Sequence, residues 1–537
     1  MFPLLLSYLA CTTATKVDSA QDVQVDSSAP EIEVGPEPSS QQPSPSLRRL
    51  TISQYQNIIK ALFSEDVVIP SSLEPDIEVD GFLTLGASIS NISPVGIERY
   101  EAASYSIAEQ IVENDALLAE LLPCESLDNL DQACWESFLN QTGSLLWRRS
   151  LTETELAGLS TLTHSIIDQS DQQTGFSYLL AALLQSPNFL YRIEQGENQV
   201  LNDFELASRL SFLIWNSAPD QQLFEIAEEG HLTDPDQLEE EVDRMLSDPR
   251  FEEGLRNFFS ELLHLYNLDT LVKDPLVFTH ASPELYQSAK EETLLFLLDN
   301  VLEDKDYRDI LTSQDTFIDR RLAALYNIPA YGADGFAQVT LEESMGRRGL
   351  LSQASVLNIH SHATSTSATG RGIFVLKSML CYTIPAPPSN VNTSIPEADA
   401  ESPTLRERLK THLEDPSCAS CHEATDRIGL GLENFDGIGR WRTYENGAQI
   451  DPSGEVDGIS FLDAWDLGRA VKEHEDFGPC ISENLYQYAL GHQMTNDEED
   501  VVNWLSVSLT ASDWSFQELL RKLVLSESFK RSGVIND

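Results

Sequence analysis

The sequence is short of basic charge. Its 537 residues contain 34 lysines and arginines against 87 aspartates and glutamates, a formal net charge of −53, and only ten of the 34 bases are lysine. A surface of this sign repels phosphate, which argues against nucleic acid or an anionic membrane surface as a partner. Two interpretations stay open: an acid-rich surface suited to a salty medium, or a preference for a basic partner.

Long hydrophobic runs are also lacking. No segment reaches the roughly 18 consecutive apolar residues that a membrane-spanning helix requires. The first ten residues, MFPLLLSYLA, are apolar and end at Cys11, which favours an export signal with Cys11 as a lipidation site. The protein would then be extracytoplasmic, periplasmic or on the cell surface, and held to the membrane by its N-terminal lipid anchor only. An ordinary signal or a truncated start is the alternative.

The segment after Cys11 has few apolar residues. Residues 12–47 are dominated by Ser, Pro, Gln and acids, as in SSAPEIEVGPEPSSQQPSPS. Such a composition cannot bury enough apolar surface to order itself, so we expect a disordered tether.

Cysteines are few, and their number suggests how they pair. The seven are Cys11, Cys124, Cys134, Cys381, Cys418, Cys421 and Cys480. Without the first and without the closely spaced pair at 418 and 421, four remain, and export would permit disulfides. Cys124 and Cys134 are close enough in sequence for a local bridge, which leaves Cys381 to pair with Cys480. The alternative is four reduced, buried cysteines.

Strand-like alternation is rare, whereas apolar residues recur at helical spacing along most of the chain. Thr51 with Gln54, and Thr152 with Glu155, have the spacing of helix-starting capping boxes. We therefore predict a mainly α, multi-domain helical scaffold with a C-terminal cytochrome-c-like segment. The predicted segments are 1–11 (export signal and lipidation site), 12–47 (tether), 48–123 (N-terminal helical domain), 124–195 (second helical segment), 196–328 (central helical domain), 329–415 (loop-rich segment) and 416–537 (C-terminal haem-c-like domain).

One motif carries chemistry. Residues 418–422 read Cys-Ala-Ser-Cys-His, the pattern of covalent c-type haem attachment. Two thiols on one helical turn can add to the two vinyl groups of a porphyrin, and the adjacent imidazole can ligate the iron. We predict haem c, with Cys418 and Cys421 as thioether anchors and His422 as the proximal ligand.

The motif has three other possible interpretations. A redox-active dithiol normally follows a strand of an α/β domain, and no such domain is predicted here. A zinc site needs a second ligand pair, for which His412 and His474 are poorly spaced. A chance occurrence is the third.

The segments around the motif resemble a known family. Downstream stand DRIGLGLENFDGIGRWR, ENGAQIDPSGEVDG and CISENLYQYALGHQM, and upstream stand RRLTISQY, ELASRLSFLIW, MLSDPRF and GRRGLLSQASVL. In this order they are similar to exported bacterial cytochrome-c-like proteins of planctomycete and myxobacterial type, built from consecutive domains of unknown function. The resemblance covers most of residues 48–535 and implies a helical scaffold outside the cytoplasm with covalent haem c. One departure is Thr366-Ser367-Ala368, where the family has Thr-Ser-Pro, so this loop is expected to be arranged differently.

Further haem contacts are predicted from residue type. Arg440 and Trp441, followed by Arg442, are candidates to hydrogen-bond the haem propionates, unless RWR is only a surface turn. For the sixth iron ligand we favour His362, with His360 and Met494 as alternatives. The remaining possibility is an open, five-coordinate iron.

Motifs of other enzyme classes are missing: the sequence has no G-x-S-x-G, no H-E-x-x-H and no P-loop. We therefore expect an exported mono-haem electron-transfer protein or haem-dependent oxidoreductase with a redox partner protein and an unknown substrate. The alternative is a cell-surface scaffold or polymer-binding protein whose haem is incidental or absent.

Overall fold

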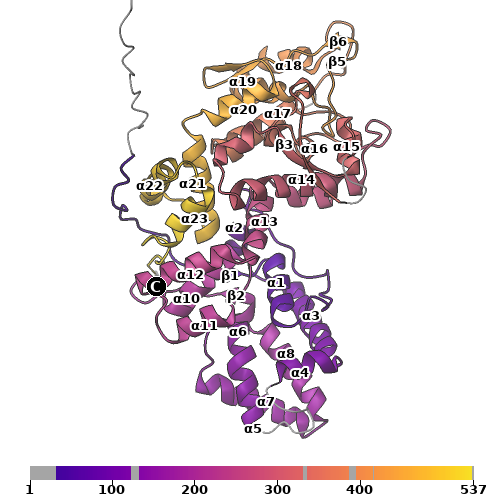
Figure 1. Ribbon diagram of the computed structural model, residues 1–537. Helices are drawn as coiled ribbons and strands as arrows, with labels where there is room; N and C mark the ends of the chain where they lie inside the picture. Colours follow the sequence, from indigo (N-terminus) through magenta and orange to yellow (C-terminus); the bar gives the residue numbers. More distant parts are fainter. Residues whose placement is uncertain (1–31, 123–131, 331–334, 386–394, 415, 535–537) are drawn as a thin grey trace, which may run out of the picture.

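The structure is a computed structural model. It describes residues 32–122, 132–330, 335–385, 395–414 and 416–534. The chain is mainly helical, as the sequence predicts, and its strands form two-stranded pairs only (Figure 1).

The helices follow one another along the chain. In the first part they are α1 (Ile52–Leu62), α2 (Leu83–Ile89), α3 (Pro94–Val112), α4 (Asp115–Leu121), α5 (Gln132–Phe138), α6 (Ser144–Trp147), α7 (Glu153–Ile167), α8 (Gln172–Gln185) and α9 (Pro187–Leu190). In the centre they are α10 (Asp203–Ile214), α11 (Gln221–Glu228), α12 (Pro235–Ser247), α13 (Arg250–Leu262), α14 (Pro283–Leu302) and α15 (Arg320–Tyr326). In the last part they are α16 (Ala354–Ile359), α17 (Ala368–Phe374), α18 (Leu405–Glu414), α19 (Pro416–Gly429), α20 (Ala464–Lys472), α21 (Phe477–Leu490), α22 (Glu499–Ala511) and α23 (Phe516–Val524).

The described residues contain four antiparallel strand pairs. They are β1 (Arg48–Arg49) with β2 (Tyr191–Arg192), β3 (Asp315–Ile318) with β4 (Ala337–Thr340), β5 (Tyr444–Glu445) with β6 (Ala448–Gln449), and β7 (Gly454–Val456) with β8 (Ile459–Phe461). The β1–β2 pair joins the start of the first lobe to its end.

Residues 48–192 form an N-terminal lobe with a core of its own. Both predicted capping boxes are present, at Thr51 for α1 and at Thr152 for α7, where each side chain satisfies a free backbone N–H. The buried faces of α1, α3, α5 and α8 meet around Tyr55, Phe138 and Phe176. The predicted segments 48–123 and 124–195 therefore share one core.

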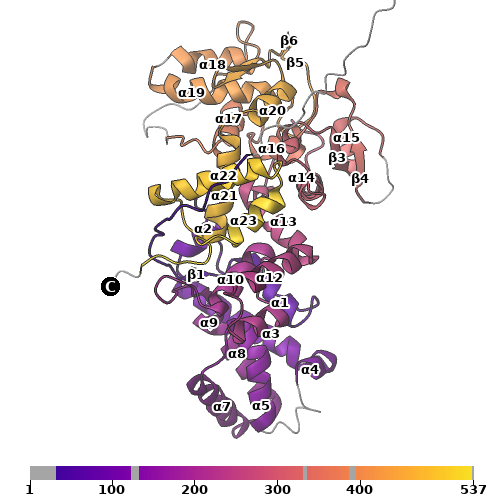
Figure 2. The same cartoon turned by 60° about the vertical axis from the view of Figure 1, so that its left-hand side comes forward.

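A second, larger core includes Phe82 and Leu85 of α2 and side chains between Leu201 and Phe529, among them those of α10, α13, α14, α17 and α20 to α23. Two smaller clusters lie beside it, one around Leu322 and Tyr326 and one around Leu405 and Leu430. The boundary expected between residues 415 and 416 does not separate packed units, because α17 lies directly on α19 (Figure 1). The two views place α18 and α19 at one end of the molecule and α5 and α7 at the other (Figure 2).

Residues 32–47, which belong to the predicted tether over 12–47, lie extended along α22 and the residues that follow α23. The Glu37 carboxylate accepts the backbone N–H groups of Glu527 and Ser528, and Trp504 Nε1 donates to the Gly35 carbonyl at 2.9 Å. These contacts come from residues some 490 positions away, so local composition could not predict them. The structure does not describe the remaining residues of the predicted tether.

Two glycines bring α17 and α19 into backbone contact. A Cβ on Gly372 would collide with the Thr425 carbonyl, and one on Gly429 would collide with the Ala368 carbonyl. Because the residue number rises along one helix as it falls along the other, the pair is antiparallel. The contact also sets the register of the two helices.

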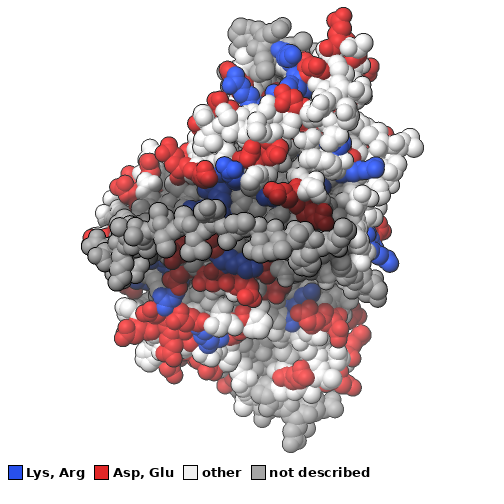
Figure 3. All heavy atoms as spheres, turned by 45° about the horizontal axis from the view of Figure 1, so that its top comes forward, with Lys and Arg blue, Asp and Glu red and all other residues white. Residues whose placement is uncertain are grey.

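The structure has the disulfide between Cys381 and Cys480. It joins the segment that follows the π-helical turn Val375–Met379 to α21. Cys134 is also disulfide-bonded. Its predicted partner, Cys124, lies outside the described residues, as does the predicted lipidation site at Cys11. Within the described ranges, no helix is both long and apolar enough to cross a bilayer. Acidic side chains are scattered over the face shown in Figure 3.

Candidate haem site

Helix α19 carries the whole Cys-Ala-Ser-Cys-His motif. The backbones of Cys418 and Cys421 lie one turn apart, and His422 follows on the same helix. The helix is positioned by its contacts with α17 and α18. A rigid helix is therefore what presents the three residues of the motif.

His422 is oriented by a buried carboxylate. Its Nδ1 lies 2.9 Å from Oδ2 of Asp426, one turn further along α19. Asp426 is only 1 % exposed, whereas the His422 side chain is 23 % exposed. With Nδ1 as the donor, Nε2 carries the lone pair, which is the tautomer that a metal requires.

Asp426 is itself held in place from α17. Thr369 Oγ1 donates to Asp426 Oδ1 at 2.7 Å and lies 3.5 Å from His422 Nδ1. Sequence analysis missed both residues. The four-residue spacing of His422 and Asp426 on a helical segment was a usable signal for the carboxylate, whereas the Thr369 contact depends on the packing of two helices.

A second buried network supports the same helix pair. The Arg371 guanidinium is fully buried and donates to the carbonyls of Leu432, Phe435 and Asp436. Glu433 pairs with Arg371 and Arg442, although burial raises the pKa of this carboxyl above its usual value. These bonds tie α17 to the chain that leaves α19.

The loop that departs from the family pattern also takes part. Ser367 accepts the Gly370 N–H and so begins α17, and Thr366 Oγ1 donates to Glu433 at 2.9 Å. Ala368 stands at the first residue of the helix, against Gly429. A proline would also suit this position, so the substitution does not by itself require a different loop.

The three predicted candidates for the sixth iron ligand lie in three different surroundings. The His362 side chain is exposed, and its backbone carbonyl accepts from Lys273 Nζ at 3.0 Å. His360 stacks on Phe374, with ring centroids 4.5 Å apart. Met494 packs against the large core beside α21, whereas His422 lies against α17. The preference for His362 thus gains no support from its placement.

Arg440 and Trp441 line a separate cavity. Its volume is about 550 Å³, and its other walls come from residues 325–329 and 339–345. The Trp441 ring covers Gly346 and packs edge-on against Phe435 at 5.1 Å. This placement does not support the expectation that the two side chains hold haem propionates. Of the RWR run, it is Arg442 that joins the network behind α17 and α19.

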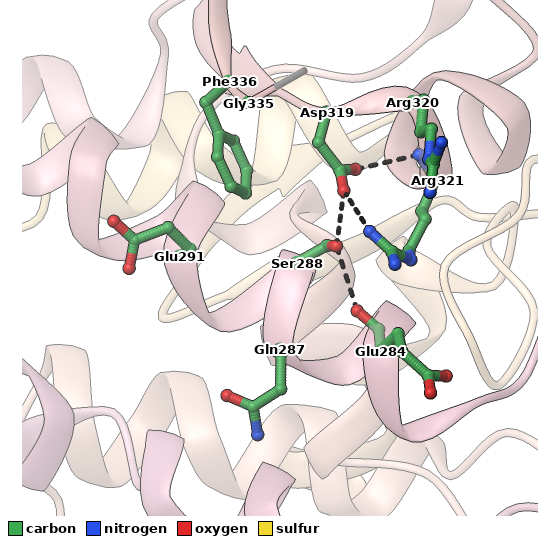
Figure 4. Close-up of a pocket in the computed structure, with 9 residues that line it drawn as sticks. All are labelled: Glu284, Gln287, Ser288, Glu291, Asp319, Arg320, Arg321, Gly335 and Phe336. Atoms are coloured by element: carbon green, nitrogen blue, oxygen red, sulfur yellow. Dashed lines mark hydrogen bonds and ion pairs between the residues drawn. The ribbon is translucent and has the colours of Figure 1, made fainter. Parts of the chain in front are cut away.

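A cavity of about 560 Å³ beside α14 has polar walls but an ordinary structural explanation. Ser288 Oγ donates to Asp319 at 2.7 Å, and Asp319 caps α15 through the N–H groups of Arg321 and Leu322 (Figure 4). Two other polar residues of its walls, Gln287 and Glu291, bond to Asp269 and Arg256. No histidine accompanies the serine among the residues drawn.

The alternative zinc site finds no support in the described part of the chain. His474 is buried, with Nε2 3.0 Å from Asp457 Oδ2 and Nδ1 accepting the Asp476 N–H. Both ring nitrogens thus have partners near the β7–β8 turn. No cluster of three or more His, Cys, Asp or Glu residues suited to a metal was found in the searched ranges.

The donor set of α19 fits a c-type haem. The His422 imidazole is partly exposed, its Nδ1 is engaged by a carboxylate, and two cysteines precede it on the same helix. Fold and site together define a multi-domain helical protein with a C-x-x-C-H helix packed inside its larger lobe.

Comparison with protein families gives five consecutive matches. Along the chain they are the proteins of unknown function DUF1587 (residues 48–113), DUF1595 (134–194), DUF1592 (201–328), DUF1588 (347–445) and DUF1585 (457–529). The chain therefore carries these five domains in that order. The DUF1588 match includes the motif and runs across the boundary expected at 415/416. Neither a curated protein nor a solved structure matched the chain.

Proposed function

We propose that this protein is an exported mono-haem c-type electron-transfer protein, with haem bound through Cys418, Cys421 and His422. The observation that carries the proposal is the contact between His422 and the buried Asp426 carboxylate, because metal-ligating histidines generally donate their other ring N–H in this way. The matched family that contains the motif is named PSCyt3, which agrees with this proposal.

The bound haem would supply a one-electron couple between ferric and ferrous iron. The residues of α19 would hold it: two thioether bonds from Cys418 and Cys421 and one nitrogen ligand from His422. The Asp426 carboxylate orients the imidazole and makes it a stronger donor, which favours the ferric state. Thr369 keeps Asp426 in place through its hydroxyl.

The setting of the protein is part of the proposal. Covalent haem c is attached outside the cytoplasm, and the apolar start with Cys11 suits export with a lipid anchor. The electron partner would be a protein. With a net charge of −53, association with a basic partner surface would be favoured electrostatically.

A scaffold or polymer-binding protein is the second candidate. The cavity of about 550 Å³ with Arg440 and the partly exposed Trp441 favours it, since aromatic and polar walls together are typical of ligand sites. This candidate does not require haem.

A pyridine haemochrome spectrum separates the two candidates. The protein is expressed with the haem-attachment machinery and purified, and its spectrum is recorded after acid–acetone extraction of loosely held haem. We expect one c-type haem per chain in the protein fraction. A protein fraction without a c-type signal would refute the proposal and leave the scaffold.

A further inference from the structure

The cavity that contains Arg440 and Trp441 lies between two of the matched domains. Its volume is about 550 Å³. Residues 325–328, at the end of α15 and just after it, belong to DUF1592, whereas Arg440 and Trp441 belong to DUF1588. Residues of β4 and the chain up to Met345 supply further walls. Small-molecule sites are commonly of this size and occur preferentially between domains.

The aromatic part of the wall is held rigidly. Trp441 packs edge-on against Phe435 at 5.1 Å. The Arg347 guanidinium lies 4.6 Å from the ring centre of Phe435 and 3.7 Å from that of Tyr326, which also lines the cavity. Arg347 is buried and donates to two backbone carbonyls. The stack therefore fixes the Trp441 ring before a ligand binds, so little conformational entropy is lost on binding.

A glycine makes room for the same ring. A Cβ on Gly346 would collide with the indole of Trp441, and Gly346 has φ 64°, a conformation that glycine adopts without steric cost. Although the ring is packed against Gly346 and Phe435, Trp441 remains 38 % exposed. The wall of the cavity thus contains a fixed aromatic ring that is partly open to solvent.

Three exposed polar side chains accompany the ring: Asn327, Glu342 and Arg440. Among the described residues, neither the Asn327 amide nor the Arg440 guanidinium has a side-chain hydrogen bond or ion pair. The Glu342 carboxylate has one long contact, with Ser344 Oγ at 3.4 Å. The guanidinium donates, the carboxylate accepts and the amide does both. Their hydrogen-bonding capacity is therefore available to a ligand.

A neutral sugar has the chemistry that this combination recognises. Its C–H face is apolar and can lie on an aromatic ring, where the burial of both surfaces is favourable. Each of its hydroxyls can donate and accept, which matches walls that carry donors and acceptors. An anionic ligand is a poorer match, because the net charge of −53 repels it.

We propose that this cavity binds a neutral oligosaccharide. The Trp441 ring stacks on a sugar face, and Arg440, Asn327 and Glu342 bond to its hydroxyls. This inference gives a ligand class to the second candidate function. The described walls of the cavity come from elements other than α19, so sugar binding does not require bound haem.

Isothermal titration calorimetry of the purified full-length protein tests the inference. The probes are the neutral hexasaccharides of cellulose, laminarin, xylan, mannan and chitin, and an oligogalacturonate serves as the anionic comparison. We expect a neutral hexasaccharide to bind at one site per chain and to bind more tightly than the oligogalacturonate. If no neutral probe binds at millimolar concentration, or if the anionic one binds best, the inference is wrong.

Variants place the binding at this cavity. Trp441→Ala should lower the affinity by about tenfold or more, while Trp441→Phe, which keeps a ring, should retain part of it. Arg440→Ala removes an exposed side chain and should lower the affinity by about tenfold. The matched control is Tyr444→Ala: this exposed ring lies outside the walls of the cavity, so its loss should leave the affinity unchanged.

An unchanged affinity of Trp441→Ala would overturn the inference, and Arg440→Ala decides if that variant does not fold. The haemochrome spectrum of the same samples separates this result from the proposed electron transfer. A protein that binds sugar without covalent haem refutes the electron-transfer function alone. A protein with haem that binds no sugar refutes the present inference alone.

Discussion

The N-terminal lobe, residues 48–192, differs in its polar residues from the junction around α17. By the junction we mean α17, α19 and the cavity lined by His264, His360 and Lys377. The N-terminal lobe contains one of the ten histidines, His164, whose Nδ1 contacts the Ser160 carbonyl of its own helix. Its buried Arg148 donates to four backbone carbonyls. At the junction, by contrast, His264 and His360 line a cavity and His422 is partly exposed on α19. Arg148 and His164 of the lobe are thus bonded to backbone carbonyls, whereas His264 and His360 line a cavity.

Backbone geometry does not separate the two regions. Each contains a π-helical turn, Leu139–Gly143 in the N-terminal lobe and Val375–Met379 after α17. Each also contains non-glycine residues with positive φ, such as Arg148 in the lobe and Cys381 at the junction. The comparison therefore rests on the side chains.

The largest expected effect is loss of the cofactor. Replacing Cys418 and Cys421 together by Ala removes both thioether sulfurs, so covalent haem should be abolished. Haem staining of a denaturing gel measures this, and circular dichroism should show an unchanged helix content. Haem that still migrates with the double variant would break the assignment.

At Glu194 we expect the opposite result, a loss of stability without a loss of haem. This carboxylate pairs with the guanidinium groups of Arg48, Arg192 and Arg209, all buried, where the lobe joins the rest of the chain. Burial acts to raise the pKa of Glu194, but the three charges outweigh it and hold the pKa below its usual value. Glu194→Gln leaves the three buried positive charges without a compensating carboxylate and should cost about 3–5 kcal/mol in the free energy of unfolding.

Chemical denaturation measures this cost, and the haem content of the folded fraction should stay unchanged. A carboxyl whose pKa is lowered by folding stabilises the fold at pH values above its unfolded-state pKa. The difference in the free energy of unfolding between wild type and variant should therefore shrink on acidification. An equal stability of both proteins at neutral pH would contradict the structural role of Glu194.

A smaller effect is expected where α17 touches α19. Gly372→Ala places a methyl group against the Thr425 carbonyl, so overpacking should cost about 1–3 kcal/mol and displace the two helices. The matched control is Gly158→Ala in exposed α7, where a Cβ meets nothing within 4 Å. That change should stabilise the helix by up to about 1 kcal/mol. Thermal unfolding measures both variants. If both midpoint temperatures change in the same direction, the contact between the two helices is not tight.

The smallest effect concerns pH. Burial raises the pKa of Glu292 to about 7, while Tyr326 and Arg347 act to lower it. The unfolded chain therefore loses this proton before the folded one, and the wild type should lose stability as pH rises from about 5 to 7. Glu292→Gln should flatten this part of the stability profile, removing a loss of on the order of 1 kcal/mol per pH unit. Parallel profiles for both proteins would show that Glu292 does not titrate in this range.

Local features of the fold could be predicted from the sequence. The helical class and the caps at Thr51 and Thr152 depend on residues within one turn of each other. The docking of residues 32–47 on α22 and on the residues that follow α23 could not be predicted, because it depends on contacts across the whole chain. For the same reason the sequence predicts five separate segments between residues 48 and 537, whereas α1, α3, α5 and α8 share one core and most of the later helices share another.

In the candidate site, too, some residues follow from local spacing in the sequence and others only from the packing of helices. Cys418, Cys421 and His422 form a local motif, and Asp426 lies at a spacing that a helix makes adjacent. Thr369, by contrast, reaches the site only through the glycine contacts between α17 and α19.

The most direct test of the central claim is the intact mass of the wild-type protein expressed with the haem-attachment machinery. Peptide mapping of the same sample locates any modification. The account predicts a mass increase of one haem per chain, carried by the peptide that contains Cys418 and Cys421. A chain of unmodified mass, with both of these cysteines free in the folded protein, would contradict it.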